Sequence, residues 1–168
     1  MEYRALRDAA RGDKRIAAII ELMLQTGVRI GEVAAFQLSD INSDSIHIRA
    51  YASQSERTVP INKPAKDALN DYLSDRGEVK NDHVFITKNQ RPLLVRNIRS
   101  SIDRYFKEAG IENAKVNDLR HTWVAHQLQS GVSLLTVSKL AGHKRLSTTE
   151  RYLQFVQNHS SESKVKLE

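Results

Sequence analysis

Apolar side chains recur three or four positions apart along residues 14–25, which is the spacing that places them on one face of a helix. They are Ile16, Ile19, Ile20, Met23 and Leu24. Gly27 follows where a residue in the left-handed conformation would end that helix. Similar patterns, three of them ended by a glycine, predict six more helices. The seven expected helices span residues 14–25, 30–38, 64–73, 95–109, 118–129, 134–140 and 148–158.

After residue 45 the pattern changes. Ile46 and Ile48 alternate with polar neighbours, as in a half-buried strand, and residues 58–61 form a second β-like run. Residues 54–56 are polar and typical of a hairpin turn between these runs, and the apolar residues 84–86 offer a third short strand. The pattern predicts an α+β fold, mostly helical, with about seven helices and a small three-stranded antiparallel sheet.

Length and composition indicate one folded domain. Of the 168 residues, 40% are hydrophobic and 27% charged, with 7 Gly and 3 Pro. We expect a single domain over residues 1–158. Residues 159–168 are polar and are expected to form a flexible tail, whose final Leu-Glu is typical of a cloning remnant. The absence of cysteine excludes disulfides, a thiolate nucleophile and a cysteine-based zinc site, and it fits a reducing compartment.

No segment has the character of a membrane span or a signal peptide. Residues 1–15 are charged throughout. The longest apolar stretch, residues 16–24, is interrupted by Glu21 and is too short to cross a bilayer. We therefore expect a cytoplasmic protein without a membrane partner.

The charge balance favours an anionic partner. The formal net charge is +6, and Lys and Arg bind polyanions because neutralised phosphates release condensed counterions. Five cations lie between residues 88 and 104, where the only acid is Asp103. They are Lys88, Arg91, Arg96, Arg99 and Arg104. A solvated helix face is the other interpretation of such a run, so charge alone does not decide between them.

Three segments carry side chains suited to phosphate chemistry. Residues 26–32 read TGVRIGE, residues 117–121 read NDLRH, and residues 140–143 read LAGH. Two threonines and then Tyr152 follow, the tyrosine nine residues after the histidine. Brought together, two guanidiniums can neutralise a phosphodiester and stabilise the extra charge of its five-coordinate transition state. A tyrosine hydroxyl could then attack phosphorus while an imidazole exchanges its proton, without metal or nucleotide.

This arrangement resembles the tyrosine recombinases of the phage integrase family, including the Xer-like members. The resemblance covers nearly the whole chain, from the first expected helix through Tyr152. The family pattern has an Arg in a TGxRxxE-like turn, an HxLRH-like box, an LGH-like box, and two threonines before the nucleophilic Tyr. The matching residues are Arg29 and Glu32, Arg120 and His121, Gly142 and His143, Thr148 and Thr149, and Tyr152.

The resemblance implies roles for four of these residues. Arg29 and Arg120 would clamp the scissile phosphate, while His143 would hydrogen-bond it and help with proton transfer. Tyr152 would form a 3′-phosphotyrosyl link that conserves the energy of the broken bond. No metal, nucleotide or other cofactor is implied.

Other residues are expected to support this site or to contact DNA. Glu32 would pair with Arg29, and His121 would pack or hydrogen-bond behind Arg120. The expected partners are duplex DNA and other recombinase protomers assembled on it. The expected DNA contacts are Arg49, Arg57, Arg96, Arg99, Lys144 and Arg145.

Two positions depart from the family pattern. Asn117 stands where the box usually opens with His, and Asn can hydrogen-bond a phosphate oxygen but cannot carry a proton at neutral pH, so proton transfer falls more on His143. Aligning ERTVPI with the usual ERxVPL ending puts Ala52 where the family keeps a Lys that protonates the departing 5′-oxygen, and no Lys lies between Lys14 and Lys63. Loss of a general acid costs on the order of 10² to 10⁴ in rate, so we expect slow or context-dependent cleavage.

The leading hypothesis is a site-specific recombinase domain that cleaves and rejoins duplex DNA through Tyr152, in the cytoplasm at the nucleoid. The alternative, favoured by Ala52 and Asn117, is a catalytically impaired DNA-binding or regulatory module with the same fold. A type IB topoisomerase shares the chemistry, but the compact Arg and Gly-His boxes favour a recombinase. Family members also clamp DNA with an N-terminal core-binding domain, and nothing before the first expected helix would form one here.

Overall fold

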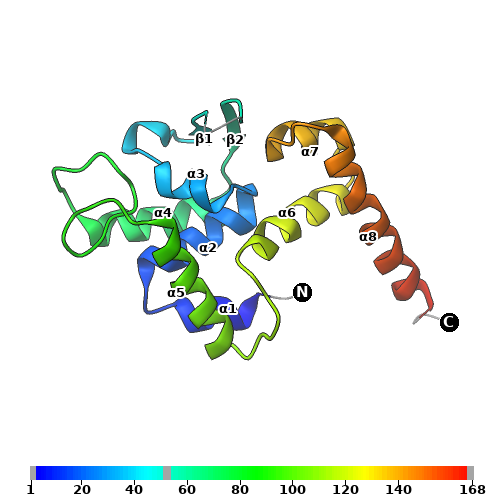
Figure 1. The fold of residues 1–168 in the computed structure, drawn as a ribbon, viewed down its shortest axis with the longest axis horizontal. Helices are drawn as coiled ribbons and strands as arrows, with labels where there is room; N and C mark the ends of the chain where they lie inside the picture. The colour runs from blue at the N-terminus through cyan, green and yellow to red at the C-terminus, as the bar shows by residue number, and fades with distance from the viewer. Residues whose placement is uncertain (1–2, 51–53, 166–168) are drawn as a thin grey trace.

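The computed structural model describes residues 3–50 and 54–165, with the side chains in those ranges as far as residue 154 and that of Val156. Within these ranges, eight α-helices accompany a two-stranded antiparallel sheet, so the expected mostly helical α+β fold is confirmed (Figure 1). The helices are α1 (Arg4–Ala10), α2 (Lys14–Thr26), α3 (Ile30–Ala35), α4 (Lys63–Arg76), α5 (Val95–Glu108), α6 (Asn117–Gln129), α7 (Leu134–Ala141) and α8 (Leu146–Val165). A 3₁₀ helix, η1, spans Leu38–Asp40, and the strands are β1 (Ser45–Ile48) and β2 (Arg57–Pro60).

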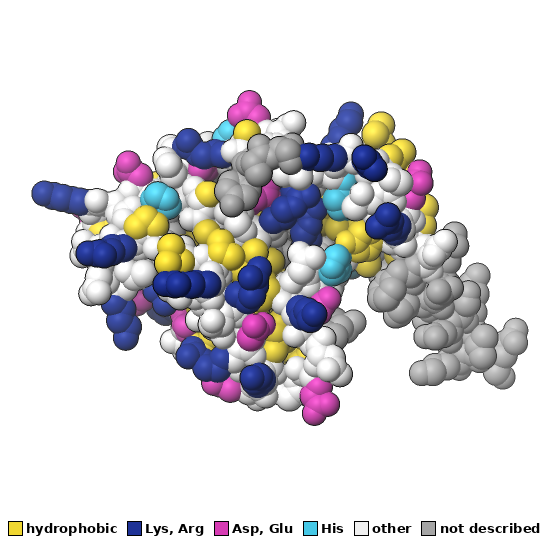
Figure 2. Space-filling model, viewed as in Figure 1, with side chains coloured by type: hydrophobic (Ala, Val, Ile, Leu, Met, Phe, Trp, Pro, Cys, Tyr) yellow, Lys and Arg dark blue, Asp and Glu magenta, His cyan; other side chains and the backbone are white. Residues whose placement is uncertain are grey.

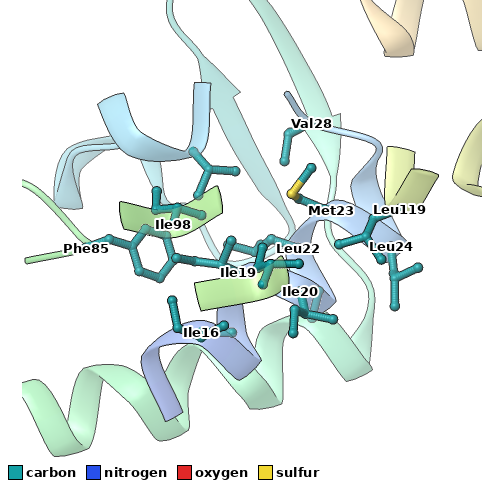
Figure 3. Packing of buried hydrophobic residues seen from close by; sticks show 14 of the residues in the cluster. Ile16, Ile19, Ile20, Leu22, Met23, Leu24, Val28, Phe85, Ile98 and Leu119 are labelled. Carbon is teal, nitrogen blue, oxygen red and sulfur yellow. The ribbon is translucent and has the colours of Figure 1, made fainter. Parts of the chain in front are cut away.

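Helix α2 runs through the main hydrophobic core. Its apolar side chains are buried because α4, α5 and α6 all pack against it. Ile19 lies near Phe85 and Ile98, and Met23 lies beside Val28 (Figure 3). Burying one large apolar side chain contributes about 1.5–3 kcal/mol. The end of α2 is therefore a firmly held point from which the next turn projects.

A second, smaller core lies between α6, α7 and α8, which sit together at one side of the molecule (Figure 1). Trp123, Val137 and Ala141 are buried in it, and Tyr152 packs against it. Helix α6 links the two cores, because Leu119, one turn before Trp123, is buried in the main core. The two cores meet along α6, and the candidate site described below lies at this seam.

Gly27 ends α2 at the seam. Its φ is +70°, and its N–H donates to the carbonyl oxygen of Met23 at 3.1 Å. A Cβ at this position would lie 2.1 Å from a ring carbon of Trp123. Glycine is therefore required both by the left-handed backbone and by the indole ring that closes on it. This approach holds the turn after α2 directly against α6.

We expect Gly27→Ala to lower the free energy of unfolding by about 3 kcal/mol, because overpacking against the indole adds to the strain of a positive φ. Gly110→Ala is a matched control, since Gly110 has a φ of +71° and nothing within 4 Å of the position of a Cβ. It should cost only about 1 kcal/mol. Urea unfolding of both variants checks this, and equal losses would refute the steric part of the argument.

The prediction of a third strand at residues 84–86 was wrong, because this segment does not join the sheet. Single bridges pair His83 with Gln37 and Ile86 with Pro92. The three residues are buried, but loops rather than a neighbouring strand run beside them. A short apolar run does not distinguish a strand from a buried extended loop, since both bury every side chain.

The helix count also differs from the expected seven within the described residues, because α1 was not expected. Its charged sequence carries a short apolar face on which Leu6 and Ala10 are fully buried. Helix α3 ends at Ala35, three residues early, and η1 follows. Helix α8 continues to Val165, where a loose tail was expected from residue 159, because the segment has no Gly or Pro to end it. In the part of the chain described here, no helix is long and apolar enough to cross a membrane.

Candidate active site

The turn between α2 and α3 presents Arg29. Arg29 has an extended backbone and lies at the N-cap of α3, immediately before the first helical residue. Its backbone N–H donates to Oε1 of Glu32 at 2.8 Å. The same carboxylate oxygen lies 3.6 Å from Nη1 of the Arg29 guanidinium. Glu32 therefore fixes the backbone of the turn and also faces the side chain, as expected from the TGVRIGE segment.

Three guanidiniums converge on the C-terminal end of α7. The last carbonyls of a helix lack partners within it and carry the negative end of its dipole, so cations bind well there. The donor and acceptor pairs are Arg57 Nε to Leu140 O (2.7 Å), Arg120 Nη2 to Ala141 O (2.7 Å) and Arg29 Nη2 to Gly142 O (3.1 Å). The end of α7 is thereby held against arginines that come from β2, α6 and the turn before α3.

Arg57, which was expected to contact DNA, lies within the site instead. Its side chain is 9% exposed, and its Nη1 and Nη2 donate to Oε2 and Oε1 of Glu32 at 2.5 and 3.0 Å. Gly142 has a φ of +70°, and a Cβ there would lie 2.8 Å from Nη1 of Arg57. The absence of a side chain at Gly142 lets this guanidinium reach the end of α7. Sequence reasoning missed this role because nothing in a four-residue strand indicates what its side chains meet.

Arg120 is the most deeply buried of the three arginines, with 4% of its surface exposed. It also donates to the carbonyl oxygen of Gly27, so it joins α6 to the turn after α2. Burial and, after it, the charges of Arg29 and Arg57 together lower the pKa of its guanidinium to about 10. Three guanidiniums and the carboxylate of Glu32 leave an excess of two positive charges. A bound anion would relieve their mutual repulsion.

Burial alone would raise the pKa of Glu32, but its hydrogen bonds and charge pairs with Arg57 and Arg29 outweigh burial, and the pKa is lowered. We expect Glu32→Gln to destabilise the protein by about 3–5 kcal/mol at pH 7, because Arg57 keeps its charge in a buried position without a counter-ion. A lowered pKa means that the carboxylate stabilises the fold above its unfolded pKa of about 4.3, and that this contribution is lost as pH falls through the folded value. The difference between parent and variant should therefore shrink below about pH 4.

Unfolding in urea at pH 7 and at pH 3 checks the Glu32 prediction. Glu21→Gln is the control, because Glu21 pairs with Arg7, whose side chain is 44% exposed, and loss of such a pair costs at most about 1 kcal/mol. Equal losses for the two variants at pH 7 would contradict the buried charge pair.

His143 follows α7 and faces the arginines. Its Nδ1 lies 2.6 Å from the hydroxyl of Thr149, which is fully buried. Burial and, after it, the charges of Arg120, Arg29 and Arg57 together lower the pKa of His143 to about 4. The imidazole is therefore neutral at neutral pH and can donate one N–H to a neighbouring oxygen.

Tyr152 lies on the second turn of α8, beside His143. The two rings are nearly parallel, with centroids 6.2 Å apart and an interplanar angle of 14°. Burial raises the pKa of the Tyr152 hydroxyl, whereas Arg120 and Arg29 lower it. The structure thus brings together the four residues to which the resemblance gave catalytic roles, from the turn before α3, from α6, from the loop after α7 and from α8.

His121 does not lie behind Arg120, where the sequence interpretation put it. Its Nδ1 is hydrogen-bonded to the hydroxyl of Tyr152, and its Nε2 lies 3.0 Å from the side-chain nitrogen of Asn117. Its ring centroid is 5.5 Å from that of Tyr152. A signal was available: residues 117 and 121 lie one helical turn apart and therefore share a face. The contact across to α8 depends on how α6 and α8 pack, which spacing does not give.

The remaining expected DNA contacts lie outside this cluster. Arg49 pairs with Asp40 at 3.0 Å. The others are exposed; they are Arg96 and Arg99 on α5, and Lys144 and Arg145 after α7. Figure 2 shows Lys and Arg side chains spread over the face that also exposes His side chains beside α6 and α7. Ala52, which aligns with the family Lys, lies outside the described residues.

Comparisons with known proteins agree with this arrangement. The model of the phage integrase family matches residues 1–159. Tyrosine recombinase XerC of Corynebacterium glutamicum is 34% identical over 141 residues, which make up 82% of this chain and 46% of that protein. The chain thus spans about half the length of the curated relatives it matches.

Solved structures show the same fold. The crystal structure of XerA recombinase aligns with a TM-score of 0.82 at 28% identity, over 89% of this chain and 56% of that one. The XerH site-specific recombinase, bound to a palindromic difH substrate, aligns with a TM-score of 0.79 at 21% identity, over 95% of this chain and 49% of that one. Because the family model matches nearly the whole sequence, the chain belongs to the phage integrase family of tyrosine recombinases.

Proposed function

We propose that this chain is the catalytic domain of a site-specific recombinase, which cleaves and rejoins duplex DNA through a 3′-phosphotyrosyl link at Tyr152. One observation carries the proposal: Arg29, Arg120, His143 and Tyr152 meet at the seam between the two cores. Residues 1–158 form this domain in the proposal.

Arg29 and Arg120 bind the non-bridging oxygens of the scissile phosphate. The surplus of two positive charges in the arginine cluster supports this role, because a phosphodiester carries one negative charge and its five-coordinate transition state carries two. The match is therefore better in the transition state than in the ground state, which is the condition for acceleration. Glu32 and Arg57 are positioning residues, since they hold Arg29 and the end of α7 in place.

His143 donates a hydrogen bond to the phosphate as a neutral imidazole. With the Thr149 hydroxyl donating to Nδ1, the ring hydrogen lies on Nε2, the only other ring nitrogen. Its pKa of about 4 makes His143 a weak proton acceptor at neutral pH. It therefore serves as a hydrogen-bond donor better than as a general base.

Tyr152 attacks phosphorus and the 5′-oxygen departs. The Lys that would protonate this oxygen in the family aligns with Ala52, so the alkoxide takes its proton from water, and we expect slow cleavage. No metal or nucleotide enters the scheme, because the phosphotyrosyl link conserves the energy needed for rejoining.

Duplex DNA and further protomers are the proposed partners. Exposed basic side chains outside the arginine cluster support binding to the phosphate backbone; they are Arg96, Arg99, Lys144 and Arg145. Arg49 also lies at the surface, but its charge is already paired with Asp40, so it supports binding to DNA less than the other four residues do. Joining strands of two duplexes requires a nucleophile for each broken strand, so the active form is an assembly of protomers on DNA.

The test is covalent capture. The chain is incubated at low salt with nicked duplexes, selected from a random pool by binding, whose short fragment diffuses away after cleavage. We expect a protein–DNA adduct that survives denaturing electrophoresis and forms in the presence of a metal chelator. Binding of DNA with no adduct would favour the catalytically impaired DNA-binding module instead.

A further inference from the structure

We propose that His121, held by Asn117, is the group that accepts the proton of Tyr152 during cleavage and returns it during rejoining. This inference rests on the proposed function, in which Tyr152 is the nucleophile. It gives the chain an internal replacement for the histidine that the family box usually carries at position 117.

The geometry favours His121 over His143 as the proton acceptor. The hydroxyl of Tyr152 is hydrogen-bonded to Nδ1 of His121 before any substrate is bound. His143 uses its Nδ1 for Thr149 instead, at 2.6 Å. A general base must lie within hydrogen-bond reach of the proton it removes, and His121 meets this condition.

The electrostatic surroundings point the same way. Burial lowers the pKa of both imidazoles, but the neighbouring charges that also shift the pKa differ between the two residues. Arg120, Arg29 and Arg57 all oppose protonation of His143. At His121 only Arg120 opposes protonation, and the carboxylate of Asp118 favours it. His121 is therefore the stronger base of the two, and it stays outside the cluster that binds the phosphate.

Asn117 acts as a positioning residue for this imidazole. Its amide lies against Nε2, with the side-chain nitrogen 3.0 Å away, one helical turn before His121. An amide can present either end to a ring nitrogen. With its oxygen toward Nε2, Asn117 accepts the Nε2 hydrogen, which leaves the lone pair of His121 on Nδ1, facing the hydroxyl of Tyr152. A histidine base held in one tautomer by a side-chain oxygen is the arrangement that makes it effective.

The proton and the electron pairs balance in both directions. As the Tyr152 oxygen forms its bond to phosphorus, its proton moves to Nδ1 of His121, and the bond from phosphorus to the 5′-oxygen breaks. The 5′-oxygen leaves with the electron pair and takes a proton from water, which leaves hydroxide. In rejoining, the 5′-hydroxyl gives its proton to hydroxide as it attacks, the bond to Tyr152 breaks, and the imidazolium returns its proton to the phenolate oxygen.

The experiment compares single-turnover rates of adduct formation for the parent and His121→Gln. Each is tested on the nicked duplex with an ordinary phosphodiester and on one whose bridging 5′-oxygen is replaced by sulfur, a leaving group that needs no acid. We expect His121→Gln to be slower by about 10²- to 10⁴-fold on both substrates, because the nucleophile must lose its proton in either case. His126→Gln makes the same change at an exposed position of α6 and should leave both rates unchanged.

A pH profile and the Asn117 position give further readouts. The parent rate should fall at low pH as His121 takes up a proton, whereas the His121→Gln rate should lack this limb. The charged or titratable groups around His121 are Asp118, Arg120, His143 and Tyr152.

Asn117→Asp keeps an oxygen for Nε2 and should cleave within a few-fold of the parent. Asn117→Leu should be slower by about 10- to 100-fold, a loss as large as that seen when the hydrogen-bond partner of a metal-binding histidine is removed.

Each outcome decides the matter. A parental rate for His121→Gln, with adduct formed by the parent, overturns the inference and leaves the proposed function intact. A slow reaction on the phosphodiester that recovers on the sulfur-containing substrate overturns it too, since His121 would then protonate the leaving group. If the parent forms no adduct with DNA it binds, the proposed function falls and the inference with it. Far-UV circular dichroism of each variant verifies folding, and Asn117→Leu provides the test if His121→Gln does not fold.

Discussion

Tyr152→Phe is expected to abolish covalent capture of DNA while leaving folding and DNA binding close to those of the parent. The substitution removes one oxygen atom. The ring that packs against the smaller core remains, so the packing of α8 against α6 and α7 is kept. The lost hydrogen bond to His121 costs about 1 kcal/mol, which is small beside the total stability of a domain. The catalytic loss is complete, because no phosphotyrosyl link forms without the hydroxyl.

The measurement is denaturing electrophoresis of protein incubated with labelled suicide DNA, together with a binding assay at the same salt concentration. Tyr105→Phe is the control, because it removes a hydroxyl that bonds a side chain, Asp13, outside the site. It should form the adduct at the parental rate. An adduct from Tyr152→Phe at that rate would show that another residue is the nucleophile.

Arg120→Met is expected to slow cleavage by at least about 10³-fold and to change the stability much less. Removing one donor that stabilises transition-state charge costs on the order of 10² to 10³ in rate, and Arg120 also holds the chain at Gly27 and Ala141. Two effects of Arg120→Met on the free energy of unfolding oppose each other. The pKa of about 10 corresponds to roughly 3 kcal/mol of electrostatic penalty, which the variant removes. The two carbonyls that lose their donor cost a similar amount, so the net change should stay within about 2 kcal/mol.

Rates at saturating DNA and urea unfolding of the same samples check the Arg120 prediction. Arg99→Met is the comparison, since Arg99 is exposed on α5 and would contribute only to binding. It should weaken DNA affinity and leave the saturated rate unchanged. A saturated rate for Arg120→Met within ten-fold of the parent would contradict the role of Arg120 at the phosphate.

The sequence predicted the helices well where a local signal marks their ends. Helix α6 begins one residue before the expected range, and α7 runs from Leu134 as expected and ends one residue late. Gly142 marks that end because its backbone is left-handed. The motifs also predicted which side chains converge at Arg29 and at Tyr152, because family spacing carries information about the fold that a single helix pattern does not.

The parts that could not be predicted depend on packing between distant segments. Arg57 was expected to contact DNA, since a strand pattern gives no sign that Glu32 lies opposite it. His121 was expected to pack or hydrogen-bond behind Arg120, and only the position of α8 shows that it faces Tyr152. Residues 84–86 were apolar enough for a strand, but a strand also needs a neighbour of sufficient length beside it.

In the proposed function, Tyr152 becomes linked to a 3′-phosphate of DNA. The most direct measurement is to form the adduct, digest it with nuclease and protease, and identify by mass spectrometry the peptide and atom that carry the nucleotide. We expect a nucleotide joined through its 3′-phosphate to the Tyr152 oxygen. A nucleotide on any other residue, or one joined through its 5′-phosphate, would contradict it.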